Sequence, residues 1–584
     1  MIRKIFRQML VTQIISAMTV MLCMLVDSIM IGRFLGVNSM TAYGLATPVL
    51  LVFAAFGSML SAGIQVMCGK TMGSGDMEAT NGCFSVSVAL AAAISLVGTA
   101  AVLLFTDPIC VLLGAGQNTP DNEVFRLTRD YLRGFIIGAP AFIFAQIMVP
   151  FMQISGSRTR LVAAVAAMTV ADIALDVLNV FVVHEGTLGM GLASSISYYI
   201  AFVIGALYFF KKSCIFRFRP ALLRRKTALD LIRYGLPTVI NQISLVLLVF
   251  VLNKVLLEVG QNLAVAAYSV ISTVGNLCYC FGSGIASVAL LLSSIFYSDE
   301  DKTELRALIK TMFFYAVALD LAMIAAVLIL APLLVGLFLT GEPEAADMAI
   351  LGLRLFSLSL LPCSLNTSYK NYLQGVNQTK FTQAISVMQN FAFTALFAFL
   401  LSRFLGTTGV WLGYLCGETL TLLVIVIAVW KRCGRVSFSA EAFSYLPPSF
   451  GAGEGDCMEE TLTDLDGAVA VSAKAAEFCR LHGENARNGA MIALCIEEMV
   501  SNIVEHGFTK DNREHSVDVR LLFKGEKRMI RIRDNCLHFD PLRYLDLHKT
   551  DDPTAHIGIR MVMKTVKNAN YVNSLGLNNL TLEM

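Results

Sequence analysis

Two acidic residues stand inside an apolar segment that is long enough to cross a lipid bilayer. The segment covers residues 161–183 and contains Asp172 and Asp176. Because a carboxylate in hydrocarbon is unfavourable by several kcal/mol, each side chain is expected to face a water-filled cavity, a partner or an ion. Their i, i+4 spacing places both on one helix face, where two like charges resist joint ionisation. The pair predicts a site for a cation or a proton, with hydrogen bonding between helices as the structural alternative.

Two more polar residues are expected at the same depth. Asp27 lies late in the apolar segment 9–31, and Ser194 lies about two turns into the segment 187–210, counted at a rise of about 1.5 Å per residue. No Lys or Arg in the spans of this half offers these carboxylates an obvious partner, which favours an ion or proton site over a salt bridge. The ionisable residues of the second half show no such convergence, and structural and substrate-lining roles stay open for them: Lys254, Glu258, Asp320 and Glu418.

A third polar pair lies in the less apolar C-terminal part of the chain. Glu498 and Asn502 are four residues apart in the string ALCIEEMVSNIVEHGF, residues 493–508, so both can leave one helix face toward a common ligand. An Asn oxygen with a nearby carboxylate suits Mg²⁺ held together with substrate phosphates. The spacing alone is a weak signal, and ordinary surface residues are the alternative.

The elements that position these residues are mostly membrane helices. The chain has 584 residues, of which 56% are hydrophobic and 15% charged, and its mean hydropathy is +0.67. This composition is far more apolar than that of a soluble protein. The 14 cysteines show no spacing typical of a disulfide framework or a zinc site, and the net charge of +2 gives no sign of nucleic-acid binding. Twelve spans are predicted at 9–31, 44–69, 83–106, 131–153, 161–183, 187–210, 234–257, 264–296, 310–339, 350–375, 381–404 and 408–430.

The distribution of positive charge predicts the orientation of these spans. With twelve spans, most Lys and Arg clusters fall on one side, which should be the cytoplasmic side, so both termini are predicted to be cytoplasmic. The strongest cluster is the loop 211–226, and Lys370 and Lys380 are assigned to the flanks of the loop after the tenth span. The predicted domains are an N-terminal six-helix lobe (1–210), a cytoplasmic inter-lobe loop (211–233), a C-terminal six-helix lobe (234–433), a linker (434–458) and a cytosolic domain (459–584).

The two lobes look like a duplication. Leu132-Arg-Gly-Phe corresponds to Leu353-Arg-Leu-Phe, Pro140 to Pro362, and Gly63 to Gly284, all at an offset near 220 residues. An even number of spans in each half gives both halves the same orientation, so the repeat is parallel, and a substrate is expected in the cleft between the lobes.

The membrane part resembles the multidrug and toxic compound extrusion (MATE) transporters. The resemblance rests on residues 26–36 (VDSIMIGRFLG), 42–48 (AYGLATP), 235–237 (GLP) and 264–268 (AVAAY), and covers roughly residues 5–430. It implies an alternating-access exporter in which H⁺ or Na⁺ influx drives efflux of small organic, often cationic, compounds. By this match Asp27 and Asp176 are coupling residues, Ser194 falls where a threonine of the sodium site is expected, and Asp172 stands where asparagine is usual. The extra charge leaves the choice between Na⁺ and H⁺ open.

The C-terminal domain is expected to be α+β, with strands at 462–465, 517–523 and 529–533 and helices at 469–482, 485–506 and 557–567. Together with residues 531–541 (RIRDNCLHFDP), it resembles the ATP-binding fold of gyrase, Hsp90, histidine kinases and MutL, in its anti-sigma-factor serine-kinase branch. The resemblance implies a Mg-ATP site in which Asn502 holds Mg²⁺, Glu498 is the general base, Asp534 accepts a hydrogen bond from the adenine amino group, and Gly558 lets backbone approach the phosphates.

Two departures from this pattern leave catalytic turnover open. Cys536 replaces the glycine that usually follows Asp-Asn, and His556 and Ile557 precede Gly558 where a glycine-rich lid is expected.

The sequence as a whole predicts a multi-pass protein of the cytoplasmic membrane. The first hypothesis is a cation-coupled efflux transporter whose C-terminal domain binds nucleotide and regulates it, in contact with a cytosolic protein. The second is a membrane-anchored serine kinase or partner-switching protein in which the transmembrane part is a sensor. The third is a transporter whose C-terminal domain has lost nucleotide binding and only docks a partner.

Overall fold

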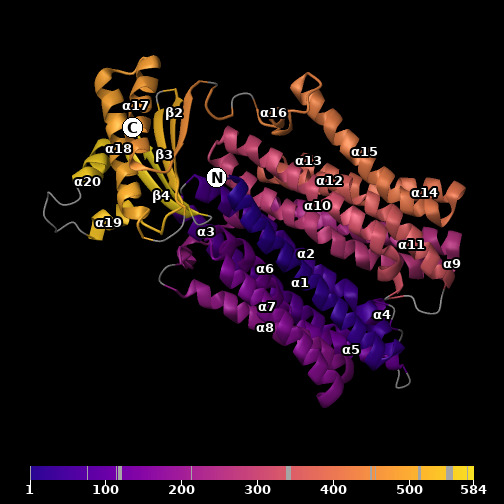
Figure 1. The fold of residues 1–584 in the computed structure, drawn as a ribbon. Coiled ribbons are helices and arrows are strands. Elements are labelled where there is room, and N and C mark those ends of the chain that lie inside the picture. The colour runs from indigo at the N-terminus through magenta and orange to yellow at the C-terminus, as the bar shows by residue number, and fades with distance from the viewer. Residues whose placement is uncertain are drawn as a thin grey trace.

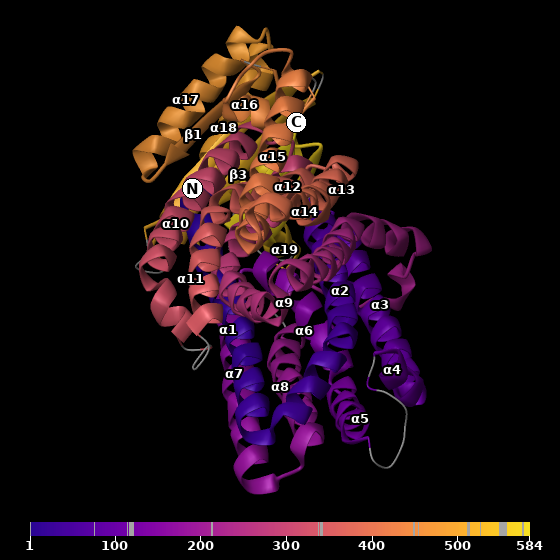
Figure 2. The same cartoon turned by 90° about the vertical axis from the view of Figure 1, so that its right-hand side faces the viewer.

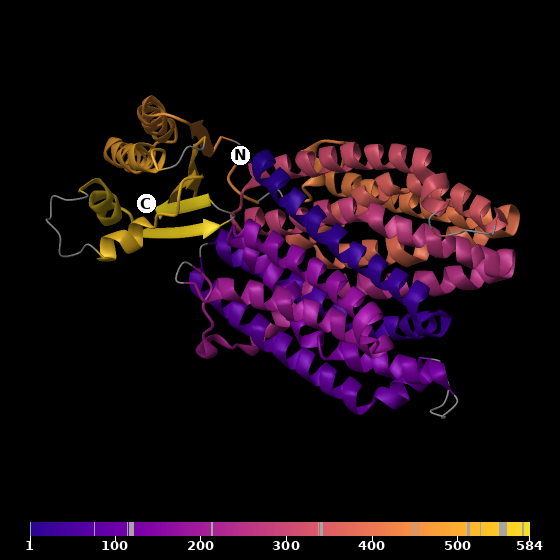
Figure 3. The same cartoon turned by 60° about the horizontal axis from the view of Figure 1, so that its bottom comes forward.

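The chain folds into a two-part bundle of long helices with a sheet-containing domain beyond one end, as seen in a computed structural model (Figure 1). The N-terminus lies at the same end of the bundle as this domain (Figures 1 and 3). The structure describes residues 2–584 except 75, 114, 116–121, 212–213, 337, 339–342, 448–449, 454, 511–513, 526, 548–556 and 575–576.

The first half of the bundle contains helices α1 to α8. Two of them begin at side-chain caps, because Asp76 accepts a hydrogen bond from the backbone of Ala79 and Asn122 accepts one from that of Phe125. The elements are α1 (Ile2–Met30), a π-helical turn (Ile31–Leu35), α2 (Val37–Gly73), α3 (Met77–Leu104), α4 (Thr106–Leu112), α5 (Glu123–Ile136), α6 (Ala139–Ile154), α7 (Arg158–Leu178), a second π-helical turn (Asn179–Val183) and α8 (Gly186–Phe209).

The second half follows a short connection with one 3₁₀ turn (Pro220–Leu222). It begins at Arg225, ahead of the predicted start of the seventh span at 234. Its elements are α9 (Arg225–Ser298), which provides two spans, α10 (Lys302–Gly336), α11 (Pro343–Leu358), α12 (Leu360–Gly375), α13 (Thr379–Val387), a π-helical turn (Met388–Ala392), α14 (Phe393–Leu405) and α15 (Thr407–Cys433). Figure 2 shows the first half below the second half, which overlaps part of the C-terminal domain in this view.

The number of membrane spans agrees with the sequence prediction. Among the described residues, ten helices are long and apolar enough to cross a membrane, and the number is twelve if each of two bent pairs is one span. The pairs are α5 with α6, bent by 46°, and α11 with α12, bent by 44°. Pro140 and Pro362 lie in the first turns of α6 and α12, where a missing N–H is tolerated. The same bend therefore recurs at corresponding places, as expected of a duplicated chain.

The two halves approach each other most closely where α2 packs along α9. A Cβ atom on Gly63 would lie 2.4 Å from the carbonyl oxygen of Leu231, and one on Gly235 would lie 2.1 Å from that of Met59. Both glycines belong to segments that the sequence analysis singled out. They are required here because any side chain would push the two helices apart.

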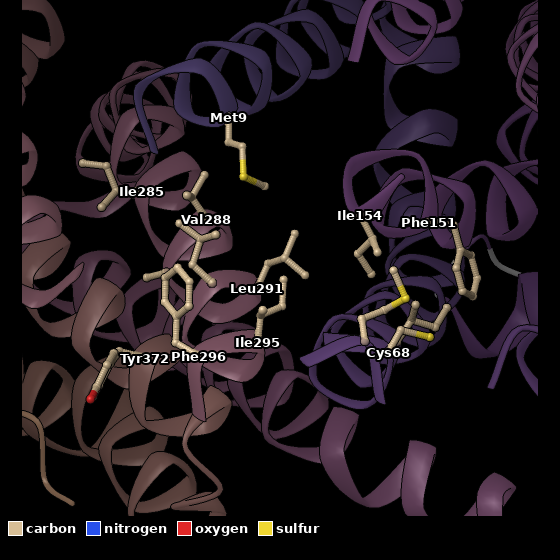
Figure 4. Close-up of a cluster of buried hydrophobic side chains, with 14 of the residues drawn as sticks. Met9, Cys68, Phe151, Ile154, Ile285, Val288, Leu291, Ile295, Phe296 and Tyr372 are labelled. Carbon is tan, nitrogen blue, oxygen red and sulfur yellow. The ribbon is translucent and has the colours of Figure 1, made fainter. Parts of the chain in front are cut away.

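An apolar cluster joins the two halves near the C-terminal domain. In Figure 4 the side chains of Cys68, Phe151 and Ile154 face those of Leu291 and Ile295 across the boundary between the halves. All five are buried. We call this group the apolar seal, because it fills the space between the halves with side chains that exclude water.

The C-terminal domain consists of one antiparallel sheet with helices on one face. The sheet has the order β1-β2-β3-β5-β4, and its helix-covered face contributes Val519, Leu521, Ile530 and Ile532 to the core. The elements are β1 (Cys457–Leu462), α17 (Leu465–Leu481), α18 (Ala486–Asn502), a π-helical turn (Ile503–Gly507), β2 (Val517–Lys524), β3 (Lys527–Asp534), α19 (Pro541–Leu547), α20 (Ile557–Thr565), β4 (Asn568–Ser574) and β5 (Leu577–Glu583). The predicted α+β class is confirmed.

Three details of this domain differ from the sequence prediction. The first strand ends at Leu462, the residue at which it was predicted to begin. The chain cannot continue as a strand through residue 465, because Asp464 caps helix α17, which begins at Leu465. Strands β4 and β5 were not predicted, since their many Asn residues disfavour strand by propensity. The predicted linker contains a short helix, α16 (Ala440–Phe443), and is fastened to the bundle: the hydroxyls of Tyr369 and Tyr372 donate to the carbonyls of Phe443 and Ser444.

Candidate functional site

Three carboxyl groups of the first half lie close together inside the bundle. Asp27 is in α1, Asp172 and Asp176 are one turn apart in α7, and these two helices pack on each other. Asp172 and Asp176 are 4% and 0% exposed. The carboxyl groups of Asp27 and Asp176 lie within hydrogen-bonding reach of each other, and Asp172 interacts electrostatically with both. We call these three residues the carboxyl cluster.

The carboxyl cluster has more acceptors than donors. Oδ1 of Asp27, Oδ1 of Asp172 and both carboxyl oxygens of Asp176 are buried without a hydrogen-bond partner. Ionised carboxylates only accept hydrogen bonds, so Asp27 and Asp176 can bond to each other only by sharing a proton. Among the described residues, no Lys or Arg forms an ion pair with any of the three. Any negative charge on the cluster would therefore have to be balanced by a bound proton or cation.

Asp172 has hydrogen-bonding neighbours on two other helices. They are the thiol of Cys23 in α1 and the hydroxyl of Ser197 in α8. Sequence analysis missed both, although Cys23 precedes Asp27 by one helical turn and this spacing could have revealed it. Ser194, which was expected here, donates to the carbonyl of Met190 in its own helix at 3.4 Å, and no contact between Ser194 and the cluster is described.

A π-helical turn follows each acidic helix of the cluster. Residues Ile31–Leu35 come directly after Asp27's helix, and Asn179–Val183 come directly after that of Asp176. Such turns are rare and frequently occur at functional sites, because they rotate the side chains on either side out of the regular helical register. Their position agrees with a functional role for the cluster.

The second half contains a buried lysine. Lys370 is 4% exposed and lies in α12, which continues to Gly375. Its Nζ donates to Oδ1 of Asn241 at 2.6 Å and to Oε1 of Gln389 at 3.0 Å. The sequence prediction that Lys370 flanks a cytoplasmic loop is thereby corrected. That prediction rested on the position of Lys370 near the end of a span, whereas its side chain points into the bundle.

Gln389 links Lys370 to Glu418. The Nε2 atom of Gln389 donates to Oε1 of Glu418 at 3.4 Å, and Asn366 donates to Oε2 at 2.9 Å. The sequence analysis found no convergence in this half, and this network is a correction: Glu418 and Lys370 meet through one amide. The other three ionisable residues have local surroundings: Lys254 lies over the Phe250 ring, Glu258 pairs with Arg403, and Asp320 lies near Ser364.

A cavity of about 270 Å³ lies between the two halves. The first half contributes α2 and α6, and the second half contributes α9, α12 and α13. Most of the lining side chains are polar, namely Ser58, Ser61, Gln65, Gln146, Thr238, Asn241, Tyr279, Ser283, Ser287, Thr367, Lys370, Asn371, Gln374, Thr382 and Ser386, and the apolar ones are Ala62, Pro237, Ala286 and Leu290. We call it the cleft cavity. It occupies the place between the lobes where the sequence predicts a substrate.

A larger cavity, of about 400 Å³, lies in the C-terminal domain between the helices and the sheet. Asn502 from α18 and Asp534 from the end of β3 both line it, so the fold brings together two residues that are distant in sequence. The remaining lining includes Met499, Ile503, Lys510, Cys536, Phe539, Tyr544, Ile559, Tyr571 and Asn578. We call it the tail pocket.

Asp534 is held in place by two hydrogen bonds. Its Oδ1 accepts from the backbone N–H of Cys536 at 2.9 Å and from Nδ2 of Asn578 at 2.8 Å. Burial raises the pKa of Asp534 above its usual range, while these hydrogen bonds oppose the increase. Cys536 is not among the described residues with positive φ, so the glycine usual at its position is not required by this backbone. Its side chain instead lines the tail pocket.

Asn502 lines the tail pocket, whereas the predicted site residues Glu498 and Gly558 are not among its lining residues. Nδ2 of Asn502 donates to the carbonyl of Glu498 at 2.6 Å, which fixes the amide and leaves Oδ1 as the atom that could reach a cation. A Cβ atom on Gly558 would lie 2.0 Å from Oε2 of Glu498, so the backbone at the start of α20 approaches this carboxylate closely. The expected lid, including His556, lies outside the described residues.

The other face of the sheet contacts the bundle through charged residues. Strand alternation directs Ile530, Ile532 and Asp534 toward the helices of the domain and Arg531 and Arg533 toward the opposite face, where Arg520 is the cross-strand neighbour of Arg531. We call Arg520, Arg531 and Arg533 the basic face. It meets the turn between α9 and α10, which contains Asp299, Glu300 and Asp301 and which we call the acidic turn.

The contact is a buried network of ion pairs. Arg531 and Arg533 bind the carboxylate of Asp299 at 3.2 and 3.1 Å, and Arg520 binds Oδ2 of Asp301 at 2.6 Å. The other oxygen of Asp301 caps α10 by accepting from the backbone of Glu304 at 3.0 Å.

All of these side chains are at most 11% exposed. Burial alone would lower the pKa of Arg533, but Asp299 and Asp301 outweigh it and raise the pKa above its usual value. The basic face therefore remains charged when it is docked.

These features define a class of protein, a two-lobed membrane transporter with a nucleotide-binding type of domain attached. A family model described as MatE matches residues 13–178 and 237–400, and one described as histidine kinase-like ATPase domain matches residues 461–584. The chain belongs to the MatE family and ends in a histidine kinase-like ATPase domain.

Curated relatives and solved structures agree with this assignment. The chain is 23% identical over 403 residues to "Multidrug export protein MepA" of Staphylococcus aureus (strain bovine RF122 / ET3-1), covering 68% of this chain and 87% of the relative. It is 23% identical over 408 residues to the protein of the same name from Staphylococcus saprophyticus, covering 69% and 88%.

The fold is similar to the "Crystal structure of MATE in complex with MaD3S", with a TM-score of 0.69, 20% identity and coverage of 76% of this chain and 97% of that one. It is also similar to the "Outward-facing conformation of a multidrug resistance MATE family transporter of the MOP superfamily", with a TM-score of 0.67, 21% identity and coverage of 72% and 94%. The expected fold of the membrane part is confirmed.

Proposed function

We propose that this MATE transporter exports small organic compounds by exchange for protons or sodium ions that bind at the carboxyl cluster. The observation that carries the proposal is the set of buried carboxyl oxygens on Asp27, Asp172 and Asp176 that lack hydrogen-bond partners. Such groups are costly inside a membrane and are expected to serve ion or proton movement. The names of the relatives from Staphylococcus, which are multidrug export proteins, agree with export as the direction of transport.

A proton is the coupling ion that the local chemistry favours. Asp27 and Asp176 lie within hydrogen-bonding reach, which two carboxyl groups tolerate when they share a proton. Among the described residues, no group of three or more His, Cys, Asp and Glu side chains is arranged to hold a metal ion. A sodium ion would therefore need hydroxyl or carbonyl oxygens in addition to the carboxylates.

Substitution of Asp27 tests the proposal. The assay follows dye efflux from vesicles containing the full chain, with the cationic dye rhodamine 6G and the anionic dye fluorescein. Asp27→Asn should abolish efflux of each dye that the wild type exports, because an amide cannot exchange a proton. Glu258→Gln is the matched control, since Glu258 pairs with Arg403 at a half-exposed site and should leave efflux intact. Full efflux by Asp27→Asn would contradict the proposal. Imposing either a pH gradient or a sodium gradient identifies the ion.

For the C-terminal domain we propose regulation of transport by Mg-ATP bound in the tail pocket. Asn502 would hold the cation, Asp534 would accept a hydrogen bond from the adenine amino group, and Gly558 would admit the phosphates close to backbone. Strand β3 supports regulation, because Asp534 at its end lines the pocket while Arg533, the preceding residue, binds Asp299 of the membrane part. ATP is assigned a regulatory role because the carboxyl cluster already offers an energy-coupling site.

A serine-kinase activity of this domain is the second candidate. The carboxylate of Glu498 lies beside the start of α20, at the phosphate side of the proposed site, where a general base would act. Transfer of the γ-phosphate of ATP to a serine of a cytosolic protein, lost in Glu498→Gln, would establish this activity.

The protein is a multi-pass protein of the cell membrane, and we propose that both termini face the cytoplasm. The charge distribution of the loops supports this orientation, and the proposed ATP binding requires it for the C-terminal domain, since the nucleotide is cytosolic. The cleft between the lobes is the proposed substrate site. The resemblance predicted substrates that are often cationic. The groups that line the cleft cavity bear on this expectation.

A further inference from the structure

The charge of the cleft cavity comes from a single lysine. Among the described residues that line it, Lys370 is the one Lys or Arg, and there is no Asp or Glu. The rest of the lining consists mainly of hydroxyl and amide side chains, which adapt to either donors or acceptors. The potential in the cavity is therefore set by the ammonium group of Lys370, and it is positive.

Lys370 also has a donor to spare. An ammonium group carries three N–H donors, and the described contacts use two of them, on Asn241 and Gln389. Both partners are neutral amides, and no carboxylate lies within ion-pairing distance of Nζ among the described residues. A buried ammonium without an ionic partner is unfavourable, so it favours a ligand that brings negative charge.

The nearest acid stands behind the wall of the cavity. Glu418 does not line the cleft cavity, and it is separated from Lys370 by the Gln389 amide, which accepts from the lysine and donates to the glutamate. The π-helical turn Met388–Ala392 makes this arrangement, because it turns the consecutive residues Gln389 and Asn390 both inward. Asn390 donates to the same Oδ1 atom of Asn241 that accepts from Lys370. Lys370 is thus held toward the cavity by a frame of amides.

We propose that the compound bound in the cleft cavity carries an anionic group, such as a carboxylate or sulfonate, that accepts a hydrogen bond from Lys370. The proposal rests on the proposed export function, because it assumes that the cleft is the substrate site. It departs from the sequence expectation of cationic substrates. An organic cation in this cavity would meet a like charge with no carboxylate among the described lining residues to bind it, whereas an anion gains both an ion pair and hydroxyl donors.

A pair of ligands of opposite charge tests the proposal on the full chain in detergent. Naphthalene-2-sulfonate and (naphthalen-2-ylmethyl)trimethylammonium share one ring system and differ in the charged group, so calorimetric titration compares charge at nearly constant shape. The wild type should bind the sulfonate at least tenfold more tightly than the ammonium compound. Lys370→Met should weaken sulfonate binding at least tenfold, and Lys370→Arg, which keeps the charge, should retain most of it.

Controls separate this inference from folding and from the export function. Lys380→Met removes an exposed lysine ten residues away on the helix that follows and should leave sulfonate binding unchanged. If Lys370→Met does not fold, the proposal is still tested by sulfonate binding to Lys370→Arg and by the affinities of the wild type for the two compounds. Binding of the ammonium compound alone, equal binding of both compounds, or binding of neither would overturn the proposal. If Asp27→Asn abolishes efflux but the wild type binds the ammonium compound more tightly, the proposed export function stands and the proposal of an anionic substrate is refuted.

Discussion

Asn502 is the residue on which the proposed nucleotide binding depends most directly. Its amide is fixed by a hydrogen bond from Nδ2 to the Glu498 carbonyl, so Oδ1 is oriented before any ligand arrives. We expect Asn502→Ala to weaken binding of Mg-ATP to the full chain at least tenfold, because a fixed oxygen ligand of the cation is lost. Calorimetry with the purified protein measures the change. Asn488→Ala is the control, since Asn488 lies exposed at the other end of α18.

Asp534 predicts how nucleotide affinity depends on pH. Burial raises its pKa, so at a given acidic pH more of the population carries a proton than for an ordinary aspartate, whereas the adenine amino group needs an accepting oxygen. Affinity for Mg-ATP should thus be highest above the raised pKa and should fall, by up to about tenfold per pH unit, as the pH drops through it. Titrations between pH 5 and 8, at about half-unit steps, measure the slope. Asp534→Asn should bind more weakly and with a flat profile, and an equally steep profile in this variant would contradict the assignment.

Strand β3 is the element that joins the tail pocket to the membrane part. Its alternation places Ile530, Ile532 and Asp534 on the domain's core side and Arg531 and Arg533 on the basic face. A one-residue shift of the strand would exchange these two sets, so the register is fixed by burial on one face and by ion pairs on the other. A change in the tail pocket that moves β3 must therefore strain the contact with the acidic turn.

The acidic turn should control docking of the C-terminal domain. Asp299→Ala leaves Arg531 and Arg533 buried without their carboxylate, which is expected to cost about 3–5 kcal/mol and to release the domain. Phe450, which stacks on Tyr297, would then become accessible, and chymotrypsin should cut after it about a hundredfold faster or more. Glu484→Ala is the matched control, because it removes the carboxylate partner of Arg528 on the same strand but away from the bundle. Equal cleavage rates in both variants would contradict this role of the turn.

Sequence patterns predicted the spans and the type of the C-terminal domain because hydropathy and periodicity are local properties. The same patterns brought Asp27 to the depth of Asp172 and Asp176, since depth follows from helical rise. They did not reveal the Lys370 network, because the direction of a side chain near the end of a span depends on packing between α9, α12 and the π-helical turn of Met388–Ala392. The contact between the basic face and the acidic turn was also invisible, since it joins residues more than 200 positions apart.

At the scale of the molecule, the apolar seal lies between the cleft cavity and the C-terminal domain. Along α9 the cavity residues Ser283 and Ser287 come first, the seal residues Leu291 and Ile295 follow, and the helix then ends at the acidic turn. The structure therefore represents a state in which the cavity is closed on the side of the domain. Opening on that side requires the halves to separate at the seal, and α9 would transmit the movement to the acidic turn where the domain is docked.

The segment from α15 to β1 determines how docking responds to concentration. Because α16 is fastened to the bundle, only residues 444–456 connect it to β1, and such a short tether gives an effective concentration in the millimolar range. Release and redocking of the domain are then intramolecular events whose balance is independent of how many copies of the protein a membrane holds. A cell that raises expression of this transporter would obtain more transport capacity while each copy keeps the same threshold for its nucleotide signal.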